Sequence, residues 1–219
     1  MKTLVKLFFG LAALFASTFL IAKFAGLLSV TQIEGWLKTA QELSPFYVGP
    51  IVAALLFADL FIAVPTLTIT ILAGYFLGFP AGAFAALVGT MLAGTIGYGL
   101  SARFGDAILG VVTRNETKIL EAKTVFRRHG FIMILLSRAA PIIPEVSACL
   151  AGITRMPFAR FLTAWTLGTV PYVMIAAWAG SASTLENPKP AIFAAIGISG
   201  ILWLAWFAFH RKTKQQVET

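Results

Sequence analysis

Long apolar runs alternate with short charged stretches along the whole chain, which is the layout of a polytopic membrane protein. A membrane-spanning helix needs about 20 predominantly apolar residues. Single runs of about this length occupy residues 4–28, 80–102, 158–180 and 191–209. We therefore predict an all-α polytopic membrane protein in which these runs are transmembrane helices.

Two further apolar stretches are interrupted near their middles by charged residues and prolines. In residues 47–79 the interruptions are Asp59 and Pro65, and in residues 130–156 they are Arg138, Pro141, Pro144 and Glu145. Each stretch is too long for one transmembrane helix and too short for two. Proline also ends a helix and leaves backbone groups unpaired, which a membrane tolerates only beside protein or a water-filled cavity. We predict that each stretch is a re-entrant helical hairpin with prolines at its turn.

Two polar segments complete the predicted layout. Residues 31–43 begin with a capping box and carry Ile33, Trp36 and Leu37 on one side. This pattern predicts an amphipathic interfacial helix that lies on the bilayer. Residues 103–129 are polar, and we predict a cytoplasmic loop that is partly helical.

The charge composition favours the hairpins over two full crossings. The chain has 17 Lys and Arg against 9 Asp and Glu, a formal net charge of +8. If both interrupted stretches crossed the membrane, the Lys and Arg residues would divide seven to eight between its sides. If both turn back, thirteen lie on one side, against Lys38 and Lys189 on the other. Because short cytoplasmic segments are enriched in Lys and Arg, we predict that both termini and residues 103–129 are cytoplasmic and that residues 29–46 and 182–190 face outward.

The two interrupted stretches resemble each other at a shift of 79 residues. The shift aligns Asp59 with Arg138, Pro65 with Pro144, and Gly89-Thr90 with Gly168-Thr169; one deletion then aligns the Leu-Ala-Gly that ends at Gly74 with the one that ends at Gly152. Each copy consists of a hairpin followed by a transmembrane helix, and the two copies enter from opposite sides. We predict an inverted repeat, and many transporters bind their substrate at the interface of such repeats.

The candidate substrate or coupling residues are Asp59, Arg138 and Glu145. An ionisable group at bilayer depth costs at least about 2.5–3.5 kcal/mol and usually marks a transport pathway. Arg138 suits an anionic headgroup because a guanidinium binds oxygens in pairs, whereas the two carboxyl groups can exchange protons. Alternatively, Asp59 and Arg138 pair with each other only to hold the hairpins together. The candidate site also includes the turn prolines Pro65, Pro141 and Pro144 and the hairpin-exit glycines Gly74 and Gly152.

Other kinds of chemistry find little support in the sequence. A single cysteine, Cys149, excludes a disulfide framework and a thiolate cluster, and the chain has only 2 histidines. Ser137, Ser147 and Thr163 have no His or Lys nearby in the sequence that would activate them as nucleophiles. A basic chain with apolar runs of this length is also not typical of a nucleic-acid-binding protein. We therefore expect no enzyme activity, no metal and no cofactor.

The second hairpin resembles a known family. Residues 137–145 read Ser-Arg-Ala-Ala-Pro-Ile-Ile-Pro-Glu and are followed by Ala151-Gly152. This resembles the DedA-like superfamily, also called the SNARE-associated Golgi protein or VTT domain family, in the branch with an Arg-x-x-Pro-x-x-Pro hairpin. The resemblance covers about residues 45–182. It implies two re-entrant hairpins, a role in moving lipids between leaflets, and importance for Asp59 and Arg138.

From these observations we expect a lipid flippase or scramblase of a bacterial-type inner membrane. It would move an anionic lipid, such as a phospholipid or a polyprenyl phosphate, with protons as a candidate coupling ion. Two alternatives stay open: a proton- or cation-coupled exchanger of small solutes, and a non-transporting membrane assembly protein. The chain would act as a monomer or a homodimer. The small residues Gly89, Ala93 and Gly97 form a face for close helix packing, which we expect inside one chain rather than in a dimer.

Overall fold

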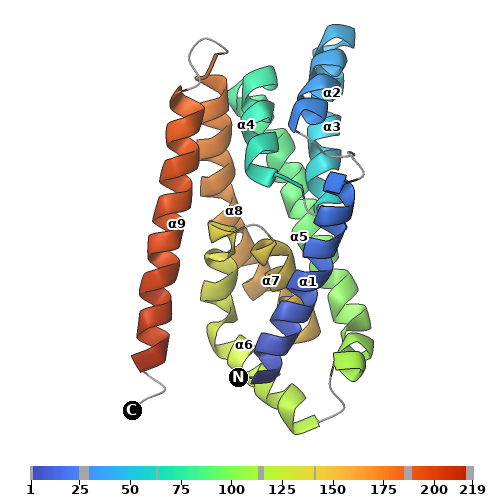
Figure 1. Cartoon of the computed structure of the whole chain (residues 1–219), viewed down its shortest axis with the longest axis vertical. Helices are drawn as coiled ribbons and strands as arrows, with labels where there is room; N and C mark the ends of the chain where they lie inside the picture. Colours follow the sequence, from blue (N-terminus) through green and yellow to red (C-terminus); the bar gives the residue numbers. More distant parts are fainter. Residues whose placement is uncertain are drawn as a thin grey trace.

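Helices make up all the secondary structure in the part of the chain that the structure describes (Figure 1). This computed structural model describes residues 2–24, 30–62, 64–112, 116–140, 142–184 and 189–215. The elements are α1 (Lys2–Phe24), α2 (Val30–Leu43), α3 (Pro45–Ala58), α4 (Thr66–Leu77), α5 (Phe79–Val112), α6 (Glu116–Leu135), the 3-10 turn η1 (Ser137–Ala139), α7 (Ile143–Ile153), α8 (Phe158–Ser181) and α9 (Lys189–Gln215). The all-helical composition agrees with the predicted fold class.

Prolines set where several helices begin. Pro45 lies in the first turn of α3, where the Ser44 hydroxyl accepts a hydrogen bond of 3.3 Å from the Phe46 backbone N–H. Helix α4 begins directly after Pro65, and Pro144 lies in the first turn of α7. Because proline has a fixed φ and no N–H, it fits a first helical turn best, although Pro50 and Pro171 lie inside α3 and α8. The prolines therefore separate α3 from α4 and α6 from α7.

Helices α3 and α4 lie in one half of the molecule, and α6 and α7 lie in the other (Figure 1). Each pair turns back at its break, and the two breaks meet near mid-height. In contrast, α5 and α8 run through both halves, and their segments Phe79–Gly105 and Phe158–Ser181 are long and apolar enough to cross a membrane. The start of α1, the end of α5, the start of α6 and the end of α9 lie at the same end of the molecule.

Glycines allow the second helix of each broken pair to pack closely on the long helix that follows the other pair. At the contact between α4 and α8, a Cβ atom on Gly74 would collide with the backbone of Ala177, and one on Gly180 would collide with the backbone of Ile71. At the contact between α5 and α7, Gly152 lies against the backbone of Tyr98. The predicted hairpin-exit glycines Gly74 and Gly152 are therefore helix-crossing residues, and neither lines the cavity described below.

The face formed by small residues on α5 packs inside the chain. A Cβ atom on Gly89 would lie 2.5 Å from the backbone oxygen of Ala53, and one on Gly97 would lie 2.7 Å from Cδ1 of Leu60. Ala93, between them, is buried. These contacts bring α3 against α5 and confirm that this face serves packing within one chain.

Two separate apolar cores form, one in each half. The first joins α2, α3, α4, α5 and α8, and its largest fully buried side chains are Ile33, Leu37, Val48, Leu56 and Ile69. The second joins α1, α6, α7 and α8 and includes Phe15, Phe126, Ile134, Leu150 and Phe161. Buried polar side chains at and beside the breaks lie between these cores, among them Asp59, Thr90, Glu145 and Thr169. Packing on either side therefore holds a polar layer in the middle of the molecule.

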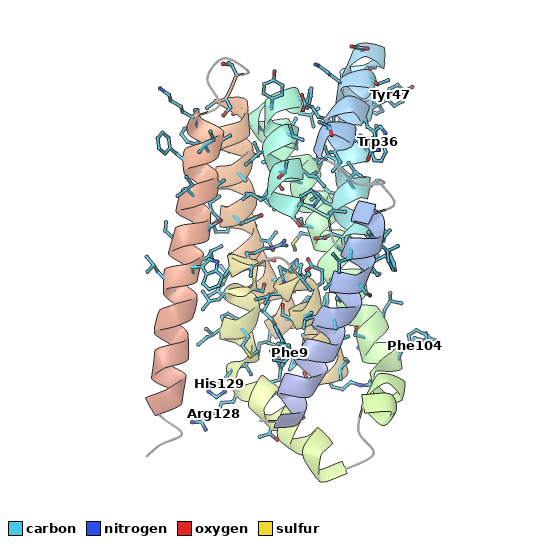
Figure 2. The ribbon with its side chains drawn as sticks, viewed as in Figure 1. Phe9, Trp36, Tyr47, Phe104, Arg128 and His129 are labelled. Atoms are coloured by element: carbon cyan, nitrogen blue, oxygen red, sulfur yellow. The ribbon has the colours of Figure 1, made fainter. Side chains whose placement is uncertain are left out.

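Large apolar side chains cover the outward faces of the long helices. On α5 the exposed ones are Phe84, Leu92, Ile96, Leu100 and Phe104, and on α9 they are Ile192, Phe193, Ile196, Ile201, Trp203 and Leu204. Figure 2 shows Trp36, Tyr47 and Phe104 pointing away from the helices. An apolar surface this extensive on a chain with an equally apolar interior is typical of a protein that lies in lipid.

Helix α2 differs from the predicted interfacial helix in what its apolar side contacts. Ile33 and Leu37 are both 0% exposed and pack against α3 and α4. Trp36, which the sequence pattern places on the same side, is 47% exposed. The pattern correctly marks an amphipathic helix, but it does not distinguish burial against protein from burial in lipid.

Helix α5 is longer than the predicted transmembrane run. The apolar run ends at residue 102, whereas the helix continues to Val112, into the segment predicted as a loop. Gly105, in this extension, lies against α7, where an added Cβ atom would be 2.9 Å from Cα of Ile153. Hydropathy marks where apolar residues stop, and it does not mark where a helix that packs on a neighbour stops.

Adding one methyl group at the α4–α8 contact should destabilise the protein. We expect Gly74→Ala to lower the free energy of unfolding by about 1–3 kcal/mol, because the new Cβ atom meets a backbone that cannot move aside. Gly99→Ala is the matched control, since Gly99 is also helical and has no heavy atom within 4 Å. That control should stabilise by about 0.5–1 kcal/mol through helix propensity. The measurement is unfolding in detergent, followed by tryptophan fluorescence. Equal unfolding free energies for Gly74→Ala and Gly99→Ala would contradict the close contact at Gly74.

Candidate functional site

One face of α8 holds the guanidinium of Arg138 in the break between α6 and α7. Nη2 of Arg138 donates a hydrogen bond of 3.2 Å to the Thr169 hydroxyl. Its Cζ lies 5.0 Å from the ring centroid of Trp165 and 5.4 Å from that of Tyr172, within cation–π range. Trp165, Thr169 and Tyr172 follow one another at helical spacing, so they share one side of α8. The hydrogen bond and the ring contacts of the arginine therefore come from a neighbouring helix, α8.

Trp165 is itself fixed by α5. Its indole Nε1–H donates a hydrogen bond of 3.3 Å to the backbone oxygen of Thr90. Its ring lies so close to Gly94 that any Cβ atom there would collide with it. Gly94 therefore makes room for Trp165, and Trp165 in turn positions Arg138.

Asp59 closes the break between α3 and α4. The side chain is 5% exposed. Its Oδ1 accepts a hydrogen bond of 2.8 Å from the backbone N–H of Val64, and its Oδ2 accepts one of 2.9 Å from the Thr66 hydroxyl. Each carboxyl oxygen thus accepts a hydrogen bond from the turn between α3 and α4, as buried polar atoms require. The carboxyl group of Asp59 also hydrogen-bonds that of Glu145.

Glu145 lies in the first turn of α7 and is 8% exposed. Its carboxyl group is near enough to Asp59 and Arg138 to interact electrostatically with both. The turn that precedes it is unusual, because Ile142 has φ 73°, in the left-handed region. A β-branched residue rarely adopts this conformation, and such strain concentrates at functional sites.

A cavity of about 380 Å³ brings most of the predicted site residues together. Its lining includes Asp59, Pro65, Arg138, Pro144 and Glu145. Its other walls come from the start of α4, from Tyr172 on α8, and from Ile198 and Ser199 on α9. Of the remaining predicted residues, Pro141 lies outside the described part of the chain.

A second cavity of about 10 Å³ lies on the α5 side of the same charged residues, which is room for roughly one water molecule. Thr90, Gly94 and Trp165 line it together with Asp59, Arg138 and Glu145. The three charged side chains thus lie between a large cavity and a small one.

Asp59 and Arg138 share the cavity but do not form the ion pair that was the structural alternative in the sequence analysis. Within the described residues, which include both partners, no ion pair joins Asp59 to Arg138. The aspartate accepts from Val64 and Thr66 and hydrogen-bonds Glu145, whereas the arginine donates to Thr169 on α8. One cation and two carboxyl groups therefore face a shared space. Among the described residues, no three His, Cys, Asp or Glu side chains are grouped as metal ligands.

Sequence reasoning missed three residues that build the site: Gly94, Trp165 and Thr169. A signal was present for Thr169, since the repeat aligns it with Thr90 and both are buried. The spacing of Trp165, Thr169 and Tyr172 on one helix was a weaker signal, because aromatic side chains at this spacing are usually packing residues.

Comparison with known proteins agrees with this picture. The VTT domain family matches residues 64–182, which is more than half of the chain and includes Arg138 and Glu145. An uncharacterised membrane protein of Synechocystis sp. is 26% identical over 214 residues, which cover 84% of this chain and 95% of that protein. No solved structure matches the chain.

Removing the acceptor of the Arg138 hydrogen bond should loosen the site. We expect Thr169→Val to lower the free energy of unfolding by about 1–2 kcal/mol, because it leaves a partly buried N–H of a charged group without its partner. Thr163→Val on the same helix is the control, since Thr163 is exposed and its hydroxyl bonds only its own helix. Equal effects of the two substitutions on unfolding in detergent would show that the Thr169 contact adds nothing.

Proposed function

This chain belongs to the VTT domain family, the DedA-like superfamily of membrane proteins, and from that premise we propose that it moves an anionic lipid between the leaflets of a bacterial-type plasma membrane. The candidate substrates are phospholipids and polyprenyl phosphates. The observation that carries the proposal is the cavity of about 380 Å³ at which an arginine and two carboxyl groups meet between two apolar cores.

In this proposal, α3–α4 and α6–α7 are re-entrant hairpins. Both members of each pair lie in the same half of the molecule, which supports this topology (Figure 1). The start of α1 and the end of α9 lie at the end where Figure 2 labels the basic residues Arg128 and His129. Since basic residues are enriched in cytoplasmic segments, this end would be cytoplasmic.

Matched contacts support an inverted repeat. Gly89 on α5 lies against Ala53 and Leu56 of α3, and Gly168 on α8 lies against Leu135 of α6. The shift of 79 residues that aligns the two glycines also aligns Leu56 with Leu135. In the same way, α4 packs on α8 as α7 packs on α5. The site lies where these two related units meet, as in many transporters.

Arg138 would be the headgroup ligand. A guanidinium has five N–H donors and stays charged even when it is buried. Thr169 accepts one hydrogen bond, and the rings of Trp165 and Tyr172 lie within cation–π range of the guanidinium, a contact that uses no N–H donor. Other N–H groups remain to bind the oxygens of a phosphate, whose paired geometry they match.

The size of the cavity suits the headgroup and not the whole lipid. Pockets of about 300–1,000 Å³ hold drug-sized molecules, so about 380 Å³ would accept a phosphate with a small substituent. The acyl chains would stay in the membrane beside the apolar outer faces of the helices. Because only the headgroup would enter the cavity, lipids with different acyl chains could use the same site.

Asp59 and Glu145 would control the charge of the cavity. If both carboxyl groups were ionised, the site with Arg138 would have a net negative charge, which disfavours an anionic headgroup. Uptake of a proton by one carboxyl group would remove this charge, so proton binding and headgroup binding would be linked. No catalytic step is part of the proposal. The buried hydroxyls of Ser137 and Ser147 donate to backbone oxygens of Ile134 and Pro144, at 2.7 and 2.8 Å, as hydroxyls that cap helical turns do.

Transport should depend on Arg138. In liposomes that carry the purified protein and a fluorescent phosphatidylglycerol, we expect Arg138→Ala to slow transbilayer movement at least about 100-fold, because the headgroup loses its charged ligand within a low-dielectric site. Arg138→Lys should retain part of the rate, since it keeps charge but not the planar fork. Arg160→Ala is the control, because Arg160 is exposed on α8.

Two outcomes would contradict this function. An unchanged rate in Arg138→Ala would remove the proposed ligand. Ion or solute flux without lipid movement in the wild-type protein would instead favour the exchanger alternative.

The proposed topology can be tested with single cysteines. In a Cys149→Ala background, we expect Thr184→Cys, in the connection after α8, to react with a membrane-impermeant maleimide on intact spheroplasts. Thr124→Cys on α6 should react only after the membrane is opened, because it lies on the basic, cytoplasmic side. Both residues are exposed, so accessibility to the protein surface is matched. Labelling of Thr124→Cys from outside would mean that the hairpins cross the membrane.

A further inference from the structure

We propose that the large cavity contains a second subsite, formed by the hydroxyls of Thr68, Tyr172 and Ser199, that binds a hydroxylated substituent on the phosphate of the headgroup. This inference rests on the proposed function for the phosphate at Arg138, and it names the class of lipid. That class is a phosphodiester that carries a polyol, as phosphatidylglycerol does. A polyprenyl phosphate has no such substituent and would leave the subsite empty.

Three different helices contribute one hydroxyl each to the lining of the cavity. Thr68 lies in the first turn of α4, Tyr172 lies in α8, and Ser199 lies in α9. Helix α8 packs on both α4 and α9, so the three side chains reach one cavity although they are far apart in the sequence (Figure 1).

None of these three hydroxyls forms a hydrogen bond with another residue in the part of the chain that the structure describes. Other helical hydroxyls donate to a backbone oxygen of their own helix, such as those of Thr70 and Thr163, which donate to Thr66 and Ala159 at 2.8 Å. A hydroxyl is both a donor and an acceptor. The three cavity hydroxyls therefore keep their full hydrogen-bonding capacity for a ligand.

The carboxyl groups of the cavity are engaged with protein groups instead. Asp59 accepts from the Val64 N–H and the Thr66 hydroxyl, and it hydrogen-bonds Glu145. Apart from Arg138, the groups left to hold the headgroup include the three neutral hydroxyls. Neutral hydroxyls suit the hydroxyls of a polyol, whereas an ammonium substituent would need carboxylate oxygens that are free of other donors.

The subsite extends from the arginine to the surface of the molecule. The ring centroid of Tyr172 lies 5.4 Å from Cζ of Arg138, so a phosphate on the guanidinium would lie beside Tyr172. Ser199 lines the cavity and is also exposed, so the cavity reaches the surface at α9. An added Cβ atom on Gly197 or Gly200 would meet no heavy atom within 4 Å, which leaves open space beside this part of α9. A substituent larger than the phosphate itself therefore has room in this direction.

Two lipids that differ only in hydroxyl groups test the subsite. Dihexanoyl phosphatidylglycerol and dihexanoyl phosphatidylpropanol have the same charge and nearly the same size, but the second lacks both hydroxyls of the glycerol. We expect the full-length protein in detergent to bind the phosphatidylglycerol about tenfold more tightly in calorimetric titrations, since each new hydrogen bond contributes about 0.5–1.5 kcal/mol.

Removal of one protein hydroxyl at a time locates the preference. Thr68→Val, Tyr172→Phe and Ser199→Ala each remove a hydroxyl with little change of shape, and each should lower the affinity ratio of the two lipids about threefold. Thr163→Val is the matched control, because the Thr163 hydroxyl bonds its own helix and does not line the cavity. That variant should keep the wild-type ratio. A defect that is only structural would weaken the binding of both lipids alike and leave the ratio unchanged.

Equal affinities of the wild type for the two lipids would overturn the subsite, as would a ratio that survives all three substitutions. Tighter binding of dihexanoyl phosphatidylethanolamine than of phosphatidylglycerol would also overturn it, because the carboxyl groups would then hold the substituent. Failure of the proposed function looks different: phosphatidylglycerol would not move between leaflets in liposomes, while the affinity ratio and its dependence on the three hydroxyls persist.

Discussion

The partly buried charge of Arg138 is the constraint on which the rest of the structure depends. A guanidinium cannot neutralise itself by losing a proton, so its surroundings must satisfy it. Here the satisfying groups come from α8, as a hydroxyl and two ring faces, and α8 can supply them only because Trp165 is fixed against α5. The two long helices and the second broken pair are therefore joined through one side chain.

That constraint explains why close helix contacts matter beyond stability. Trp165 reaches its position because Gly94 has no side chain, and α4 and α7 reach the long helices because Gly74 and Gly152 have none. Each of these glycines removes a methyl group where two backbones, or a backbone and a ring, must approach. One apolar core holds the helices of each half together, and the positions of the polar side chains between the cores depend on the packing of both.

The sequence identified site residues where a charged residue or a proline interrupted an apolar run. Asp59, Arg138 and Glu145 stand out because they interrupt apolar runs, and Pro65 and Pro144 stand out because they cannot continue a helix; all of them line one cavity in the structure. Gly94, Trp165 and Thr169 do not contradict their surroundings, since each is ordinary within an apolar helix. Their importance depends on which helix lies opposite, and local patterns do not encode that. The same limit applies to α2. Its apolar side was predicted correctly, but the pattern did not show that Ile33 and Leu37 on this side pack against protein.

Two positions that align in the sequence carry different chemistry in the structure. Asp59 and Arg138 align in sequence, yet they carry opposite charges and are satisfied in different ways. The aspartate accepts hydrogen bonds from its own turn, so the break between α3 and α4 is closed locally. The arginine donates to another helix, so the break between α6 and α7 is held by α8. Opposite charges at aligned positions thus give the two breaks different chemistry, and Glu145 adds a second carboxyl group to the cavity that Asp59 and Arg138 share.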